Sequence, residues 1–302
     1  MDAMGGREVQ AMTDPLTPTE VFDAERRRLF GIAYRMLGTV ADAEDILQEV
    51  WIRWEHTDQG AVREPAAFLT TVTTRLCINE MQSARARRET YIGPWLPEPV
   101  NTEDDPALGA ERGEALQFAV LLLLENLTPT ERAAYVLREA LDYPYDRIAE
   151  IVRSSVTSAR QLVSRARRHL AEGRRIPAPA PDQRRLLEAF LTAARGGDVS
   201  ALEELFTEDV VSYTDGNGVK LAARIPVHGR GRVAKFVAAF SSHFWTGKTI
   251  GWVQVNGQPA ATLSEGGEVT TIVTITSAAD GIAQLLWVMS PAKLRHVVPA
   301  GG

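Results

Sequence analysis

The chain contains 302 residues, of which 45% are hydrophobic, and its formal net charge at pH 7 is −6. This composition predicts two or three globular domains and excludes a membrane-spanning protein, because no apolar run approaches roughly 18 residues. The single Cys77 excludes an intramolecular disulfide and cannot alone build a zinc site.

The N-terminus lacks the basic and apolar segments of a secretion signal. We therefore expect a cytoplasmic protein without a membrane association, a cofactor or a metal. Changes in composition along the chain predict its organisation: a disordered N-terminus (1–15), a helical domain (16–92), a linker (93–110), a second helical domain (111–172), a Pro-Ala linker (173–183), a third domain (184–295) and a tail (296–302).

Residues 21–83 predict three helices, and the second of them carries an acidic stripe. One of its faces is apolar, with Ala43, Ile46, Leu47, Val50 and Trp51 at helical spacing. The opposite face favours a docking surface for a basic partner, although a merely solvated acidic face is the equal alternative. The acidic stripe consists of Asp42, Asp45 and Glu49 and continues in Ile52.

The third helix begins after Pro65 and ends in a basic segment. Its amide side chains can read bases and its arginines can hold a phosphate backbone. If this helix stood alone, a solvated basic helix end would be the better explanation of these residues. Its outward residues are expected to be Thr70, Thr74, Arg75, Asn79 and Gln82, followed by Arg85, Arg87 and Arg88. Tyr91 and Trp95 are candidate stacking groups for unpaired bases.

The linker contains the segment Trp95-Leu96-Pro97-Glu98-Pro99. Its prolines prevent a continuous helix. A free tether has no reason to expose an indole, so we expect this segment to pack on a neighbouring domain; an incidental apolar spot is the alternative. The acidic part, residues 103–105, is expected to be a solvated tether.

Residues 146–170 predict a helix-turn-helix in a locally basic stretch. Ser154 and Ser155 form the turn. The outward polar set favours DNA binding through bidentate base contacts, and an amphipathic basic helix in a small bundle is the alternative. The expected buried seam is Val156, Ala159, Val163, Ala166 and Leu170, and the outward residues are Thr157, Ser158, Arg160, Gln161, Ser164, Arg165 and Arg168.

Four segments in this order (30–38, 41–51, 127–132 and 145–151) resemble regions 2 and 4 of bacterial extracytoplasmic-function (ECF) sigma factors. The resemblance implies two all-α sigma domains that bind core RNA polymerase and promoter DNA. The helix with Asp42, Asp45, Gln48, Glu49 and Ile52 would dock on the β′ clamp helices, with the β flap as a further contact. The 70–88 helix would engage the −10 element, aided by loop 55–64, and the 156–170 helix would read the −35 element.

The chain beyond residue 184 changes character. Helices at 184–195 and 199–206 precede strand-like runs at 209–214, 251–255, 259–263, 269–276 and 283–289, with a helix at 232–244 between them. The β-branched run 269–276 is typical of a strand. This order predicts an α+β domain with an antiparallel sheet.

This third domain resembles the SnoaL-like domain fused to one subgroup of these factors, a nuclear-transport-factor-2-like cone. The resemblance implies regulation in cis, with the cone packed against both sigma domains. From the residues alone, 215–218 is a turn motif. The segments that carry the resemblance contain Trp95, Leu96, Pro97, Glu98 and Pro99; Asp215, Gly216, Gly218 and Lys220; and Pro291, Lys293 and Leu294.

A SnoaL-like enzyme or a small-molecule sensor is the alternative function for this domain. The acid–base candidates are Tyr213, Asp215, His228, His243 and Trp252. Catalysis needs a buried carboxylate with a partner at hydrogen-bond distance, and no pattern in the sequence brings these residues together. We therefore expect no catalysis and retain an unidentified small ligand as a partner of this domain.

Overall fold

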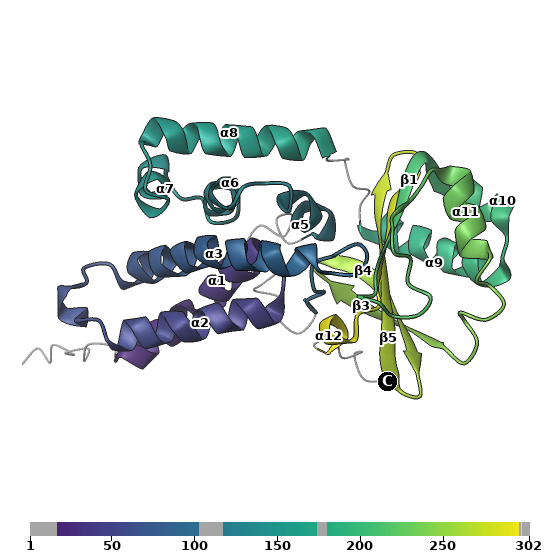
Figure 1. The fold of residues 1–302 in the computed structure, drawn as a ribbon, viewed down its shortest axis with the longest axis horizontal. Coiled ribbons are helices and arrows are strands. Elements are labelled where there is room, and N and C mark those ends of the chain that lie inside the picture. The colour runs from purple at the N-terminus through teal and green to yellow at the C-terminus, as the bar shows by residue number, and fades with distance from the viewer. Residues whose placement is uncertain (1–16, 103–116, 174–179, 296, 298–302) are drawn as a thin grey trace, which may run out of the picture.

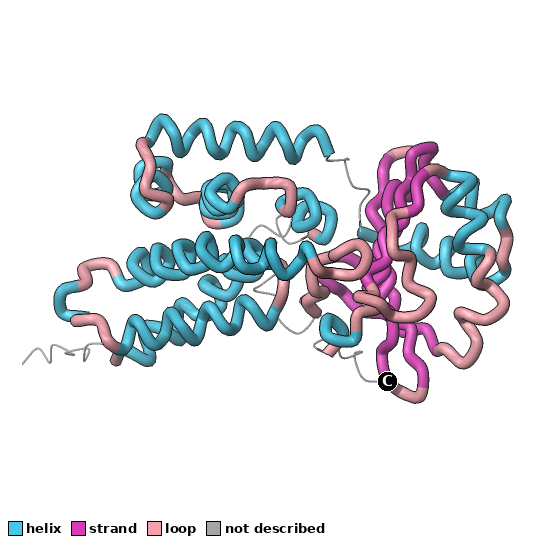
Figure 2. Tube along the Cα trace, in the orientation of Figure 1, coloured by secondary structure: helices cyan, strands magenta, loops and turns pink. Residues whose placement is uncertain are grey.

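The computed structural model describes residues 17–102, 117–173, 180–295 and 297. The expected disordered N-terminus, the acidic tether and nearly all of the C-terminal tail lie outside these residues. Figures 1 and 2 show a helical half and a sheet-containing half side by side. Among the described helices, none is long and apolar enough to cross a membrane.

The first helical domain consists of α1 (Pro18–Leu37), α2 (Val40–Glu55) and α3 (Pro65–Glu89), with the short 3-10 helix η1 (Gln59–Ala61) before α3. Thr17 and Glu20 form a capping box at the start of α1. Gly38 ends that helix at a φ of 80°, a left-handed conformation that glycine adopts without a Cβ penalty. The three predicted helices are present.

The second helical domain contains the predicted helix-turn-helix. Its elements are α5 (Phe118–Leu124), α6 (Pro129–Tyr135), a π-helical turn η3 (Val136–Ala140), α7 (Tyr145–Ile151) and α8 (Val156–Gly173). The Ser155 hydroxyl accepts a hydrogen bond from the Ser158 amide at 3.0 Å and so caps α8. The sequence patterns did not reveal α5, whose apolar residues have no polar alternation that would define a face.

The third domain has a six-stranded sheet in the order β2-β1-β6-β5-β4-β3. β1 and β6 are parallel and the other neighbouring pairs are antiparallel, so the predicted antiparallel sheet is in fact mixed. The five predicted strands are present, and the short β2 was missed. Their bounds are β1 Phe206–Asp215, β2 Val227–His228, β3 Thr249–Val255, β4 Gln258–Glu265, β5 Glu268–Ala278 and β6 Gly281–Val288.

The two faces of this sheet have different neighbours. One face packs on α9 (Ala180–Gly196), α10 (Val199–Leu205) and α11 (Arg230–Ala238) through residues such as Val273 and Leu285. The other face packs on the linker and on α5, through residues such as Val253 and Val288. Successive residues of a strand point to opposite faces. Because neighbouring strand residues such as Ile272 and Val273 are both apolar, both faces of the sheet are apolar. The last helix, α12 (Pro291–Leu294), lies on the linker side.

Candidate functional site

The acidic face of α2 is exposed, as the sequence predicts. Asp45 and Gln48 are exposed, while Asp42 and Glu49 are half-buried. Glu49 forms an ion pair with Arg53 at 2.8 Å within the helix. Ile52 keeps 49% of its surface accessible to solvent and continues the exposed face of α2 with an apolar side chain.

The α3 surface differs from its prediction. Asn79 and Gln82 are exposed, but Thr70 and Thr74 are completely buried, so their expected outward placement is wrong. The reason is tertiary: the second helical domain packs over this part of α3, which the pattern of α3 alone does not indicate. The side chains of Arg85, Arg87 and Arg88 lie outside the described residues.

Arg75 of α3 is half-buried and joins the two helical domains. Its guanidinium donates to the carbonyl oxygens of Ile151 at 3.0 Å and Glu150 at 2.9 Å. Both carbonyls belong to the C-terminal end of α7, where the helix dipole favours a cation. Arg75 therefore stabilises the contact between α3 and the helix-turn-helix.

Further polar contacts and a common core hold the helical domains together. Arg28 donates to the Tyr143 hydroxyl at 2.6 Å, and that hydroxyl contacts Thr70 at 3.2 Å. Arg132 is buried, pairs with Glu125 at 2.6 Å and donates to the Arg35 carbonyl at 2.8 Å. One continuous cluster of buried apolar residues includes side chains from both domains. The two domains consequently form a closed unit.

The outward face of α8 is as predicted, except at its start. Val156 is 40% exposed, so the buried seam of α8 begins one turn later, at Ala159. Leu162, which was not predicted to be part of the seam, is also buried. Arg165 pairs with Glu131 at 3.0 Å, and Arg160 lies over the Tyr145 ring. The exposed residues are Thr157, Arg160, Gln161, Ser164, Arg165 and Arg168, and Ser158 is half-buried. Figure 1 shows α8 at the outer side of the helical half.

Asp215, at the end of β1, is the centre of the junction between the domains and is completely buried. Its Oδ2 accepts hydrogen bonds from the Leu96 amide at 2.7 Å and from Lys293 Nζ at 2.6 Å. Its Oδ1 accepts one from the Tyr91 hydroxyl at 2.5 Å. Burial, and then the Asp215 charge, raises the pKa of Tyr91. A carboxylate first interpreted as part of a turn thus binds the linker.

Lys293 completes this junction. Its Nζ also donates to the Leu96 carbonyl at 2.5 Å and lies 4.2 Å from the centre of the Trp95 ring. Pro291 is exposed and Leu294 is buried. Lys220 is exposed and does not enter the junction, although the sequence grouped it with Asp215. We call the set Tyr91, Trp95, Leu96, Asp215 and Lys293 the junction lock; Leu96, Asp215 and Lys293 are buried, and the two aromatic residues are half-buried.

The turn after Asp215 has room only for glycine at its first position. A Cβ on Gly216 would lie 2.3 Å from the Cβ of Ala222. Gly218 has a φ of 87°, which glycine adopts readily. The prediction of a turn here is confirmed.

The linker connects the first helical domain to the sheet. The Glu98 amide donates to the Gly38 carbonyl at 2.8 Å, and its carboxylate accepts from the Val40 amide at 2.9 Å. The Tyr34 hydroxyl donates to the Glu98 carbonyl at 2.5 Å and accepts from Asn256 Nδ2 at 2.7 Å. The prediction that this segment packs on a neighbouring domain is confirmed, and Leu96, Pro97, Glu98 and Pro99 are buried.

The acid–base candidates of the third domain do not converge. Tyr213 packs against the core on the linker side of the sheet, whereas His228 and His243 are exposed. Trp252 lies under the Arg184 guanidinium at 3.6 Å. In the part of the chain that the structure describes, no group of His, Cys, Asp and Glu residues could hold a metal ion.

Family comparisons agree with this architecture. Residues 21–87 match the model of sigma-70 region 2, and residues 117–170 match the model of sigma-70 region 4. The acidic helix α2 and the helix-turn-helix thus lie in segments that define the class of RNA polymerase sigma subunits.

The proteins that are most informative about this class are ECF sigma factors. The ECF RNA polymerase sigma factor SigJ of Mycobacterium tuberculosis is 38% identical over 231 residues, 75% of this chain and 74% of SigJ. The probable ECF sigma factor SigI of M. tuberculosis is 30% identical, over 90% of this chain and 92% of SigI. The crystal structure of M. tuberculosis SigJ superposes with a TM-score of 0.73 at 32% identity and covers 90% of this chain and 96% of SigJ.

The chain belongs to the ECF RNA polymerase sigma factors. It is therefore a non-catalytic subunit that binds core RNA polymerase and promoter DNA and directs transcription initiation. The enzyme alternative is wrong for the chain as a whole.

Proposed function

We propose that the third domain regulates this sigma factor in cis by holding its two sigma domains closed. The observation that carries the proposal is the buried Asp215 carboxylate, which binds the linker backbone at Leu96 across a domain boundary. The linker in turn binds the end of α1 through Gly38 and Tyr34. We assign the domain to the SnoaL-like, nuclear-transport-factor-2-like type on its motifs and its curved mixed sheet.

The closed arrangement bears on promoter binding. The α3 helix is our proposed reader of the −10 element through Asn79, Gln82, Arg85, Arg87 and Arg88. Arg75 is occupied by the end of α7, and Thr74 is covered. Because Nε and Nη2 of Arg75 already donate to α7, a bidentate contact of this edge of the guanidinium with a −10 phosphate requires the helical domains to separate.

The remaining surfaces are assigned by their exposure and chemistry. We propose that Asp42, Asp45, Gln48, Glu49 and Ile52 dock on the β′ clamp helices, and that the second helical domain contacts the β flap. The exposed face of α8 reads the −35 element in the major groove, where Arg and Gln make bidentate contacts with base edges. Val156, exposed at the start of α8, adds an apolar contact for a thymine methyl group.

Promoter-dependent transcription in vitro tests the cis restraint. With core polymerase, Asp215→Asn is expected to yield several-fold more transcript than the parent chain, because removing one partner leaves Lys293 buried without a counter-charge. Breaking such a pair costs about 3–5 kcal/mol. Tyr91→Phe removes the hydrogen bond to Asp215 but leaves the Asp215–Lys293 ion pair in place, and should give a smaller increase.

Lys220→Gln is the matched control, because Lys220 is close in sequence to Asp215 but exposed. Its output should equal that of the parent chain. Equal output from all four proteins would refute restraint by the junction lock. No promoter-dependent transcript from any of them would instead contradict the assignment of the −10 and −35 surfaces.

A further inference from the structure

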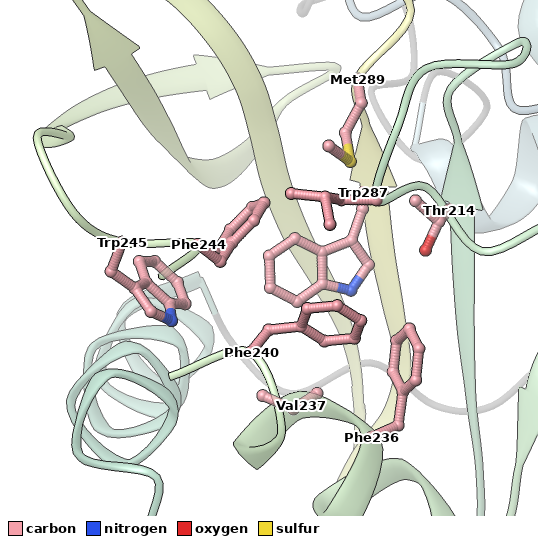
Figure 3. A pocket seen from close by; sticks show the side chains of 9 residues that line it. Thr214, Phe236, Val237, Phe240, Phe244, Trp245, Trp287 and Met289 are labelled. Atoms are coloured by element: carbon pink, nitrogen blue, oxygen red, sulfur yellow. The ribbon is translucent and has the colours of Figure 1, made fainter. Parts of the chain in front are cut away.

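The apolar cavity of the third domain is too small to take a ring-sized ligand without movement. Figure 3 shows it among the aromatic side chains of α11, of the segment after α11 and of β6. It offers about 40 Å³ to the centres of water-sized molecules, whereas a cavity that binds benzene has about 150 Å³. The cavity is therefore a gap in an aromatic core. A different aromatic residue, in the helix-turn-helix, bears on specificity.

Arg160 contacts an aromatic ring near the start of α8. It is the fifth residue of that helix and is exposed. Its guanidinium carbon lies 5.5 Å from the centre of the Tyr145 ring, within the range of a cation–π contact. In a helix-turn-helix, the N-terminal residues of the second helix are the ones that reach base edges in the major groove. Arg160, the first arginine of α8, is thus placed for a base rather than for a phosphate.

The contact with the ring leaves the hydrogen-bond donors of Arg160 available. A ring binds the flat face of a guanidinium, whereas carboxylates and base edges bind its N–H groups. Arg160 has no ion-pair partner among the described residues. By contrast, Arg165 donates from Nε to Glu131 at 3.0 Å, and Arg167 pairs with Glu139 at 2.7 Å. An arginine with a supported face and free donors can bind O6 and N7 of guanine with a smaller loss of side-chain entropy.

Tyr145 is itself held in place. It is the first residue of α7, is half-buried and packs against the apolar core of the helix-turn-helix. The Arg138 guanidinium carbon lies 5.0 Å from the centre of the same ring, and Nη1 of Arg138 donates to the Tyr143 carbonyl at 2.9 Å. Because the ring has contacts on the core and on Arg138, it offers α8 a fixed surface.

We propose that Tyr145 is a positioning residue that holds Arg160 for a guanine in the −35 element. The proposal deepens the proposed function, since it rests on α8 as the reader of that element. Tyr145 acts through Arg160 and not through a contact of its own with DNA. Loss of the ring therefore lowers the preference for one base, whereas a general loss of structure lowers the affinity for every sequence.

The test uses holoenzyme made from core polymerase and the full chain, with the promoter of the transcription assay carrying a randomised −35 hexamer. Sequencing of the bound and unbound DNA gives the base preference at each position. Arg160→Ala should reduce the preference for guanine at one position at least five-fold, as expected for the loss of one bidentate contact. Tyr145→Leu should reduce the same preference about two- to five-fold, the range of an exposed cation–π contact. Tyr145→Phe retains the ring and should match the parent chain.

Arg168→Ala is the matched control, because Arg168 is also exposed on α8 but lies further from its start. It should weaken binding to all sequences alike, as the loss of a phosphate contact does. An unchanged guanine preference in Arg160→Ala would overturn the role of Arg160. An unchanged preference in Tyr145→Leu, equal losses in Tyr145→Leu and Tyr145→Phe, or a loss spread over all positions would overturn the role of Tyr145. A parent holoenzyme without any −35 preference would instead contradict the −35 surface of the proposed function.

Discussion

At the scale of single residues, the polar groups of the junction are buried but have partners. Asp215 accepts from an ammonium, a backbone amide and a phenol, which offsets the cost of removing its charge from water. Tyr34 is both donor and acceptor between the linker and the sheet. Because an unpaired buried polar group costs about 1–3 kcal/mol, small changes here should have measurable effects.

Gly38 is one such position. A Cβ there would lie 2.6 Å from the Trp95 ring, and the φ of 80° already disfavours other residues. Gly38→Ala should therefore lower the free energy of unfolding by about 1–3 kcal/mol and change the fluorescence of Trp95, measured by denaturant titration. Gly247→Ala is the control, because Gly247 has a φ of 76° but no atom within 4 Å of its ideal Cβ. Equal losses in both variants would show that the contact with Trp95 contributes nothing.

Because of Tyr34, the free energy of unfolding depends on pH in the alkaline range. Burial raises its pKa well above the ordinary value of 10. Above about pH 10 the unfolded chain therefore loses the phenol proton while the folded chain retains it, so the stabilisation present below pH 10 is lost as the pH rises. Tyr34→Phe should be less stable at pH 8, by about 1–3 kcal/mol, and should lose less further stability between pH 9.5 and 11 in denaturant titrations. Parallel curves for the two proteins would contradict this assignment.

At the scale of elements, α2 shows what the spacing of apolar residues in a helix can predict. The pattern identified its buried and exposed faces, and the structure agrees on both. We expect Asp45→Arg with Glu49→Arg to weaken binding to core polymerase at least ten-fold, by reversing charges that face a basic partner, without unfolding α2. Binding by fluorescence anisotropy and helicity by circular dichroism measure the two effects.

The matched control reverses two exposed acids at the β4–β5 turn, Glu265→Arg with Glu268→Arg. This variant should bind the polymerase as the parent chain does. If the α2 variant also retained its affinity, the acidic stripe would be a solvated face, the alternative that the sequence left open.

Other elements show why the sequence alone did not predict the contacts between the domains. The period of α3 placed Thr74 outward, but α3 has a second neighbour in the other helical domain, and no local pattern reveals a helix covered on two sides. Asp215 carried a turn signal because Gly216 and Gly218 follow it, but two of its partners, Tyr91 and Leu96, are more than a hundred residues away in the sequence. Single-element periodicity predicts helices and strands, whereas such long-range pairings are fixed only by the packed domains.

At the scale of the whole molecule, the three domains form a chain of contacts. The sheet holds the linker through Asp215, the linker holds α1 through Gly38 and Glu98, and a common core joins the helical domains. Release at the junction lock therefore weakens the link between the sheet and the sigma half, which the Tyr34–Asn256 hydrogen bond and the packing of α5 on the sheet also maintain. We propose that this release lets the helical domains separate.

A distance measurement between the helical domains tests this claim most directly. Spin labels on Arg53→Cys and Arg168→Cys would report from exposed positions on α2 and α8, while the native Cys77 is buried and its thiol pKa is raised by burial, which makes it inert. Double electron–electron resonance should give a single distance distribution in the labelled parent chain and in Lys220→Gln, and an added population of longer distances in Asp215→Asn. An identical single distribution in all three proteins would contradict the account.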